Sequence, residues 1–62
     1  MPIVKIEIWE GRNEETKEIL IRNITKAVSD SINCPPEKVI VVITDTPKAN
    51  WGIGGVQASK GF

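Results

Sequence analysis

The 62-residue chain has no histidine, no tyrosine and a single cysteine, Cys34. Without histidine, the side chain that most often transfers protons at neutral pH is missing, and so is the imidazole ligand of many metal sites. A single cysteine excludes an internal disulfide, and a thiol that no histidine activates is a poor nucleophile. We therefore expect no metal site and no thiol chemistry, and any proton transfer must use another group.

The chain also lacks an excess of charge and a long apolar segment. Eight basic and eight acidic residues give a formal net charge of zero, which argues against a nucleic-acid or anionic-membrane surface. The longest apolar run, residues 39–43, is too short to span a bilayer, and the N-terminus lacks the basic and then apolar pattern of a secretory signal. We expect no nucleic-acid partner, no membrane partner and a cytoplasmic location, with which one free thiol agrees.

The length predicts one small domain over residues 1–62 with too little interior of its own. A domain of about 60 residues hides only roughly 60% of the surface that its unfolded chain exposes, and it usually needs a disulfide, a metal or a partner chain. Since no disulfide or metal is expected, self-association is the expected way to complete the core.

Apolar periodicity predicts a strand followed by a helix. Residues 3–9 alternate with a period of two, as in a half-buried strand. Asn13, followed by two glutamates, is suited to cap a helix that runs to about Ile32. Asn33 and the prolines that follow it are suited to end that helix. The apolar stripe of the helix comprises Leu20, Ile24, Ala27, Val28 and Ile32.

The second half of the chain predicts a parallel strand and a small hairpin. Residues 39–43 are apolar on both faces, which predicts a strand covered on both sides. Two strands joined through one helix predict a right-handed β-α-β unit with parallel strands, whose uncovered face is a subunit interface. Residues 46–50 are turn-like and residues 51–56 are rich in glycine, which predicts a loop and hairpin. The fold class is α+β, with the β-α-β protomer and its C-terminal hairpin completed by oligomerisation.

Pro2 is the first candidate for chemistry. If Met1 is removed, as is common before a small residue, Pro2 becomes a secondary amine at the end of a rigid strand. A free N-terminal amine has a pKa near ~7.7–8.0, and burial in an apolar pocket lowers it further, which suits a general base. The competing interpretation is that Pro2 only begins an edge strand, where its missing N–H does no harm.

Arg12 and Trp51 are candidates for substrate binding. Arg12 lies beside the expected helix N-terminus, where a cation is disfavoured by ~0.3–1 kcal/mol, and with nearby helix N–H groups it would form a carboxylate-binding corner. A surface arginine screened by neighbouring glutamates is the alternative. Trp51, next to Gly52, is placed to wall a small apolar pocket or to pack in an interface.

Four features, in register and without gaps, carry a resemblance to a known family: Pro2 opening a strand, Glu10-Gly11-Arg12, Leu20-Ile21-Arg22, and Trp51-Gly52-Ile53-Gly54-Gly55. Over almost the whole chain they resemble the 4-oxalocrotonate tautomerase family. The resemblance implies a homo-oligomer, a hexamer built as a trimer of dimers. It also implies enol–keto tautomerisation of a small 2-hydroxy or 2-oxo unsaturated acid without a cofactor. Pro2 would be the catalytic acid/base, Arg12 the catalytic residue that binds the substrate carboxylate, and Trp51 an aromatic residue of the pocket.

One position departs from the family pattern. Well-studied members use a second arginine early in the second strand, and the aligned residue here is Ile40. Isoleucine cannot hold a carboxylate, and a charge-assisted hydrogen bond is worth roughly 1.5–3 kcal/mol. We expect weak turnover of the dicarboxylate 2-hydroxymuconate, or a smaller and more apolar monoacid as substrate. Trp9 would line and narrow the pocket, and Lys38 and Lys48 are candidates to replace the missing charge.

Two other functions stay open. In the same fold, a cationic proline would support hydration or dehalogenation of an unsaturated acid, although that chemistry relies in the family on extra arginines that this chain lacks. From a different class, the chain would be a non-catalytic oligomeric module whose pocket has decayed, as Ile40 allows.

Overall fold

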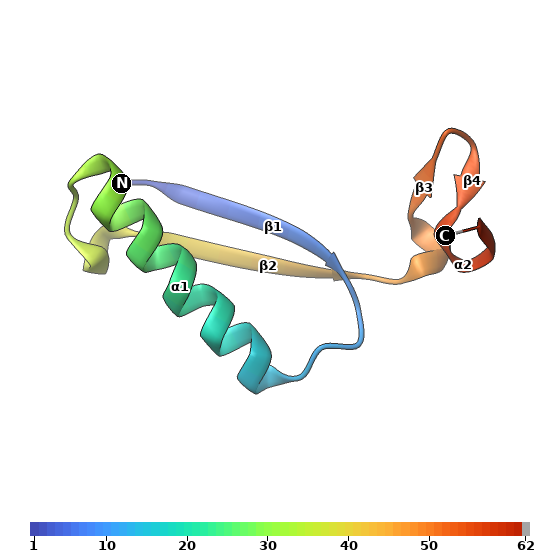
Figure 1. Cartoon of the computed structure of the whole chain (residues 1–62), viewed down its shortest axis with the longest axis horizontal. Coiled ribbons are helices and arrows are strands. Elements are labelled where there is room, and N and C mark those ends of the chain that lie inside the picture. Colours follow the sequence, from blue (N-terminus) through green and yellow to red (C-terminus); the bar gives the residue numbers. More distant parts are fainter. Residues whose placement is uncertain (62) are drawn as a thin grey trace.

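The structure is a computed structural model that describes residues 1–61. Its elements along the chain are β1 (Ile3–Trp9), α1 (Glu14–Ile32), the 3-10 helix η1 (Pro36–Lys38), β2 (Ile40–Thr46), the 3-10 helix η2 (Lys48–Asn50), β3 (Gly52–Ile53), β4 (Val56–Gln57) and α2 (Ala58–Gly61). Figure 1 shows β1, α1 and β2 packed together, with the β3–β4 hairpin and α2 projecting from the far end of β2. Within residues 1–61, neither α-helix is long and apolar enough to cross a membrane.

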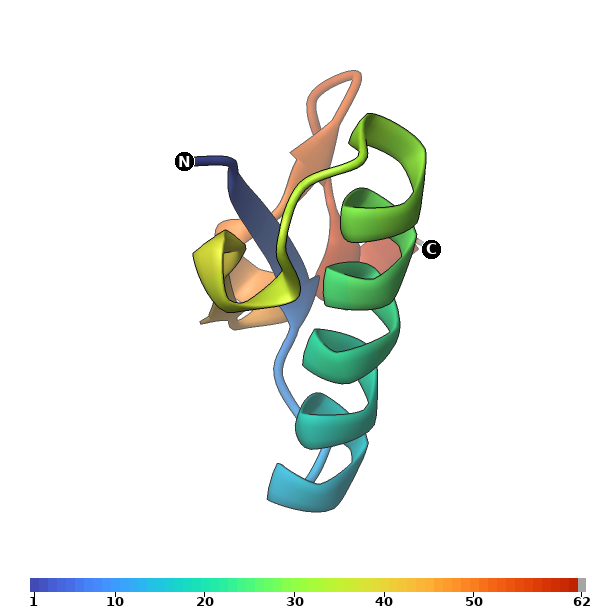
Figure 2. The same cartoon turned by 90° about the vertical axis from the view of Figure 1, so that its left-hand side faces the viewer.

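β1 and β2 form a two-stranded parallel sheet, as predicted. Ile3 lies opposite Ile40 at one end, and Trp9 lies opposite Thr46 at the other. α1 packs across one face of this sheet (Figure 2), while no α-helix within residues 1–61 covers the other face, on which Ile3, Ile40 and Val42 are exposed. Exposure alternates along β1 as far as its penultimate residue, in agreement with the predicted period of two, and it also alternates along β2 as far as Thr44, so alternate residues turn toward α1.

The predicted bounds of the second strand are wrong at both ends. Its predicted first residue, Val39, donates its backbone N–H to Pro36 O at 3.1 Å and so closes the 3-10 turn of η1. The strand continues beyond Ile43 through residues 44–46, because these residues pair with the last three residues of β1. An apolar run indicates where a strand is covered, whereas the length of the strand depends on its pairing partner.

Both predicted ends of the helix are confirmed. At the start, the Asn13 side chain accepts a hydrogen bond from the Thr16 N–H at 2.8 Å. At the end, Asn33 adopts the left-handed conformation with φ 57° and donates its N–H to Ser29 O. Asparagine tolerates this conformation better than most residues do, so a local signal was sufficient to predict the end.

The predicted apolar stripe of α1 is only partly covered. Leu20, Ile24 and Val28 are half-buried, whereas Ala27 and Ile32, which were predicted to be buried, are exposed. Strands about 4.8 Å apart make a sheet narrower than a helix about 10 Å across, so a two-stranded sheet cannot cover the whole stripe. Ile32 is also the last helical residue, with 59% of its surface exposed.

The predicted C-terminal hairpin is confirmed. β3 and β4 pair in antiparallel fashion, and the two glycines between them, Gly54 and Gly55, have φ of 61° and 86°. Positive φ at both central residues is what a tight hairpin turn requires, and glycine adopts it without strain. Ala58, the first residue of the short helix α2, donates its N–H to Trp51 O at 2.7 Å and anchors the hairpin. The sequence did not predict α2.

The protomer has almost no interior. Ala58 is the one buried apolar residue in the part of the chain that the structure describes. The protomer exposes 4756 Å², whereas a compact monomer of its mass exposes about 3,950 Å². Its radius of gyration is 14.5 Å, compared with about 10.6 Å for a compact domain of this length. On the helix-free face of the sheet, Ile3, Ile40 and Val42 are 57%, 40% and 45% exposed.

Candidate active site

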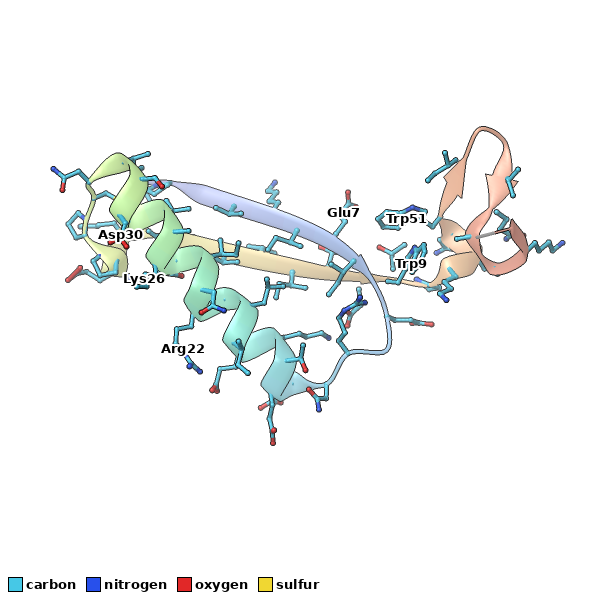
Figure 3. The ribbon with its side chains drawn as sticks, viewed as in Figure 1. Glu7, Trp9, Arg22, Lys26, Asp30 and Trp51 are labelled. Carbon is cyan, nitrogen blue, oxygen red and sulfur yellow. The ribbon has the colours of Figure 1, made fainter. Side chains whose placement is uncertain are left out.

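Two tryptophans meet where the sheet ends and the C-terminal hairpin begins. Trp9 is the last residue of β1, and Trp51 lies between η2 and β3. Their ring centroids are 5.9 Å apart with an interplanar angle of 79°, which is an edge-to-face contact. Figure 3 shows the pair at this junction. Trp9 and Trp51, which the sequence singles out separately, thus form one aromatic wall.

Arg12 contacts the main chain of Trp9. Its guanidinium Nη1 donates a hydrogen bond to Trp9 O at 3.0 Å. Gly11, with φ 121°, lets the chain turn back after β1 so that the arginine returns to the strand it has just left. The helix N-terminus offers fewer free N–H groups for a carboxylate than the sequence indicated, because the Asn13 side chain already accepts the Thr16 N–H. The arginine and the tryptophans, rather than the helix, define the corner.

Lys48 adds a second cation to the same corner. Its Nζ lies 4.8 Å from the centroid of the Trp9 ring, within the range of a cation–π contact. Lys48 begins η2, and the same turn carries the chain to Trp51. Lys38, the other lysine considered as a replacement cation, lies in η1 at the opposite end of β2.

Pro2 lies at the other end of the sheet. The seven residues of β1 separate it from Arg12, and at about 3.3 Å per residue Pro2 and Trp9 are about 23 Å apart. Pro2 O accepts a hydrogen bond from Ile40 N at 3.0 Å, so Ile40 is its neighbour in the ladder. Met1 is 84% exposed. Within one protomer, the structure therefore brings Arg12, Trp9 and Trp51 together but does not bring Pro2 to them.

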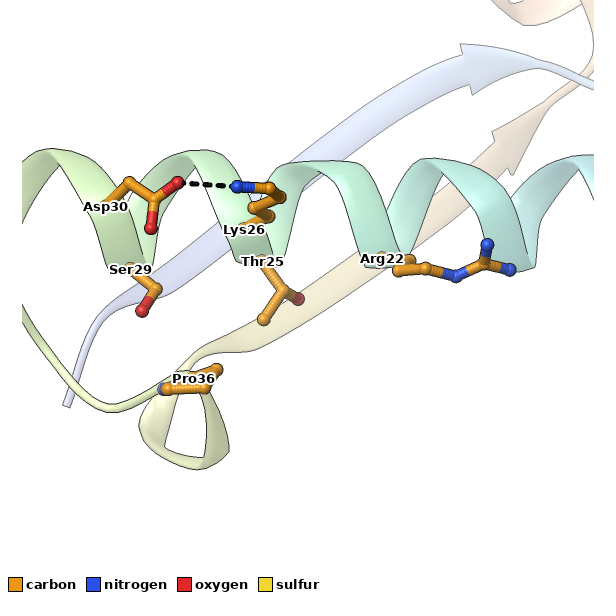
Figure 4. A pocket seen from close by; sticks show the side chains of 6 residues that line it. All are labelled: Arg22, Thr25, Lys26, Ser29, Asp30 and Pro36. Atoms are coloured by element: carbon orange, nitrogen blue, oxygen red, sulfur yellow. Dashed lines mark hydrogen bonds and ion pairs between the residues drawn. The ribbon is translucent and has the colours of Figure 1, made fainter.

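One surface hollow lies away from these residues. It has a volume of about 350 Å³ and lies along α1 (Figure 4). Its lining residues are Arg22, Thr25, Lys26, Ser29, Asp30 and Pro36. Lys26 donates a hydrogen bond to Asp30 at 2.9 Å, and this bond together with the carboxylate charge raises the pKa of Lys26 above its usual value. An ammonium has no lone pair with which to accept a proton, and the one carboxylate among the lining residues, Asp30, is already paired with Lys26.

A second hollow, of about 330 Å³, adjoins Trp51. Its lining residues are Ala49, Asn50, Trp51, Gly52, Gly55, Val56 and Gln57. The Gln57 side chain donates to Ala49 O at 2.6 Å, which ties the hairpin to η2. In residues 1–61, no three histidine, cysteine or carboxylate side chains gather as ligands for a metal ion.

Sequence reasoning missed the contact between Lys48 and Trp9. The two residues are far apart in the chain, and each is exposed or half-exposed, so neither periodicity nor spacing links them. Their proximity depends on how the chain leaves β2 and enters η2, which is a tertiary arrangement without a local signal.

The β-α-β protomer, with Pro2 just before its first strand and Arg12 bonded to the main chain of Trp9, is a small α+β protein. The chain belongs to the tautomerase family, since residues 2–61 match the family described as "Tautomerase enzyme". It is 52% identical over 60 residues to a 2-hydroxymuconate tautomerase of Pseudomonas putida, covering 97% of this chain and 95% of the relative. Its enzyme class, a tautomerase and hence an isomerase, is thereby confirmed.

Solved structures agree with this assignment. A 4-oxalocrotonate tautomerase isozyme from Methylibium petroleiphilum is 46% identical, superposes with a TM-score of 0.89, and the match covers 94% of each chain. A heterohexamer 4-oxalocrotonate tautomerase from Chloroflexus aurantiacus is 28% identical, with a TM-score of 0.92 and coverage of 97% of each chain. The predicted α+β fold class and the predicted family are confirmed.

Proposed function

We propose that the chain tautomerises a small 2-hydroxy-2,4-dienoic acid in an active site shared between protomers, with Pro2 as the acid/base and Arg12 as the carboxylate-binding residue. The observation that carries the proposal is the separation of Pro2 from Arg12 by the whole of β1. A six-carbon acid is far shorter than about 23 Å, so Pro2 and Arg12 of one protomer cannot both contact the same substrate molecule.

A second copy of the chain removes this difficulty. β1 and β2 form a two-stranded sheet, so within the described residues each strand has an open edge at which another strand can pair, and the exposed apolar residues of the helix-free face can be buried in the same assembly. If two protomers meet in a two-fold, antiparallel arrangement, Pro2 of one approaches Arg12 of the other, and the pair contains two such sites. The area that the protomer exposes beyond a compact monomer, about 800 Å², matches what each partner buries in a standard interface.

The proposed reaction is a proton transfer in two steps. The Pro2 amine accepts the proton of the substrate 2-hydroxyl, the double bonds shift along the chain, and the same nitrogen returns the proton to a distant carbon to give the conjugated ketone. Arg12 neutralises the substrate carboxylate, while Trp9 and Trp51 exclude water from one side of the bound substrate. An amine with an ordinary pKa near 7.7–8.0 can both accept and donate a proton near neutral pH.

This chemistry requires removal of Met1. While Met1 is present, the Pro2 nitrogen belongs to an amide and has no basic lone pair. With 84% of its surface exposed, Met1 is accessible on the protomer. Intact-mass measurement of the protein from its source tests this condition directly. Complete retention of Met1 would support the competing function, a non-catalytic oligomeric module.

The substrate and assembly proposals follow from relatives and from Ile40. The curated relatives act on 2-hydroxymuconate, which carries two carboxylates, and one solved neighbour is a heterohexamer. Here Ile40, whose side chain is apolar, donates its backbone N–H to Pro2 O. We propose a hexamer with a monocarboxylate as the preferred substrate. A cytoplasmic location, expected from the sequence, is part of the same proposal.

Mixing two inactive variants tests the shared site. Pro2→Ala and Arg12→Ala are each expected to lose at least 100-fold in ketonisation rate, followed by ultraviolet absorbance. When the two are unfolded together and refolded, half of the dimers are mixed, and one of the two sites in each mixed dimer has both residues. Up to about a quarter of the wild-type rate should therefore return.

Two outcomes would contradict the proposal. No recovery from refolded mixtures that demonstrably contain both chains would show that each site lies within one protomer. Equal rates for Pro2→Ala and the processed wild type would remove Pro2 from the mechanism altogether.

A further inference from the structure

Two cations meet at Trp9 from different parts of the chain. Arg12, in the loop after β1, donates to the Trp9 carbonyl oxygen at 3.0 Å, and the Lys48 ammonium lies 4.8 Å from the centroid of the Trp9 ring. Arg12 contacts Trp9 at its main-chain oxygen and Lys48 contacts it at its ring, so an anion bound beside Trp9 would be attracted by both positive charges. The corner therefore favours an anionic ligand more strongly than either residue alone.

Neither of these cations is neutralised within the described residues. The ion pairs of residues 1–61 are Lys17 with Asp45, Arg22 with Glu18 and Lys26 with Asp30. Asp45, which lies near the same end of the sheet, is thus already paired with Lys17. Two cations that contact one aromatic residue and have no carboxylate partner within residues 1–61 form a local positive site.

We infer that Lys48 is a substrate-binding residue that holds the same carboxylate as Arg12. The inference rests on the proposed function, because it takes the corner around Trp9 as the carboxylate end of the active site. The two cations have complementary roles. Arginine offers a planar pair of N–H donors, whereas lysine offers a compact charge that can rotate toward the remaining oxygen lone pairs. The Trp9 ring supports the ammonium and shields one side of it from water.

This assignment gives the substrate a charged end and an apolar end. The charged end lies between Arg12 and Lys48, while Pro2 has Ile40 as its ladder neighbour. A second carboxylate at the Pro2 end would meet an isoleucine side chain and lose its hydration without a partner. The matching substrate class is a small 2-hydroxy-2,4-dienoic acid with one carboxylate.

The test compares a charged substrate with its neutral counterpart. Ketonisation of 2-hydroxypenta-2,4-dienoate and of its methyl ester is measured with processed wild type, Lys48→Met and Lys48→Arg. Methionine keeps an apolar stem over Trp9 and removes the charge. For Lys48→Met we expect KM for the acid to rise about 10–100-fold, while kcat/KM for the ester stays within about threefold. Lys48→Arg should keep the acid KM within about fivefold, because the charge remains.

Controls separate this role from a structural one. Lys26→Met makes the same change of charge on the exposed side of α1 and should leave both substrates unaffected. Ester turnover reports the intact site, because a variant that fails to assemble loses the ester rate as well. Lys48→Gln, which keeps a polar head group, repeats the measurement in that case.

Failure of the inference about Lys48 can be distinguished from failure of the proposed function. If Lys48→Met and Lys48→Gln change acid and ester equally, or change neither, Lys48 does not bind the carboxylate, whatever the role of Pro2. If instead Pro2→Ala turns over both substrates like the wild type, the proposed function fails, and the inference about Lys48 fails with it.

Discussion

A charge placed on the helix-free face of the sheet should abolish both assembly and catalysis. Val42 lies in the middle of β2 opposite Lys5, with 45% of its surface exposed, and it belongs to neither end of the proposed site. Val42→Lys would place two ammonium groups directly across from each other, which is itself unfavourable in a sheet. If this face is buried between protomers, the new charge must also lose its water.

The expected effect is large. Full burial of a valine side chain is worth about 1.5–3 kcal/mol, and burial of an unpaired ammonium costs several kcal/mol more. A loss of at least about 4 kcal/mol per protomer weakens association roughly 1,000-fold, since each 1.4 kcal/mol changes the constant tenfold. At micromolar concentration, Val42→Lys should therefore sediment near the 6.8 kDa of one chain.

Sedimentation and ketonisation are measured on the same samples. The control is Asn23→Lys, which adds the same charge at an exposed position of α1 and should keep both the assembly and the rate. The refuting result is a Val42→Lys protein that sediments as a folded monomer and still turns over 2-hydroxypenta-2,4-dienoate at the wild-type rate. Such a protein would show that one protomer holds a complete active site.

Three further predictions concern single positions. Ile40→Arg should raise kcat/KM for 2-hydroxymuconate about 10–100-fold while leaving the monocarboxylate nearly unchanged, and equal effects on both in the ultraviolet assay would contradict the proposed apolar end. Asn13→Ala removes the acceptor of the Thr16 N–H and should cost about 1 kcal/mol in urea unfolding, with Asn13→Asp as the conservative control. Asp30→Asn should lower the midpoint of urea unfolding slightly at pH 8. At a pH above the folded-state pKa of Lys26, it should leave the midpoint unchanged. The hydrogen bond to Asp30 raises the folded-state pKa of Lys26 above 10.5. The Lys26–Asp30 interaction therefore contributes fully to folding stability below pH 10.5, and this contribution is lost as the pH rises through the folded-state pKa.

Local signals predicted the ends of the helix correctly, whereas long-range features were not accessible. Asn13 and Asn33 act on backbone groups within a few residues, so their roles follow from residue type and position. Coverage of Ala27 depends on the width of the sheet, which no helical periodicity reports. The end of β2 depends on its pairing with β1 in the same way.

The same distinction applies to the candidate site, where some residues could be predicted from the sequence and one contact could not. Pro2 could be singled out because removal of Met1 would make it a free amine, and Arg12 because a cation is disfavoured beside a helix start. That they lie at opposite ends of the sheet also follows from the predicted strand. The approach of Lys48 to Trp9 depends on how η2 turns the chain, and no residue pattern between the two positions encodes it.

The number of residues in β1 is more tightly constrained than the identity of those residues. Deletion of one residue shortens the strand by about 3.3 Å and turns every later side chain to the opposite face. In a two-fold pair both reaction centres would be misaligned together, because each copy of the strand spans from one centre to the other. Homologous tautomerases should therefore vary in residues 3–9 by substitution and almost never by insertion or deletion. The glycine turn at residues 54–55, which spans no such distance, should tolerate changes in length.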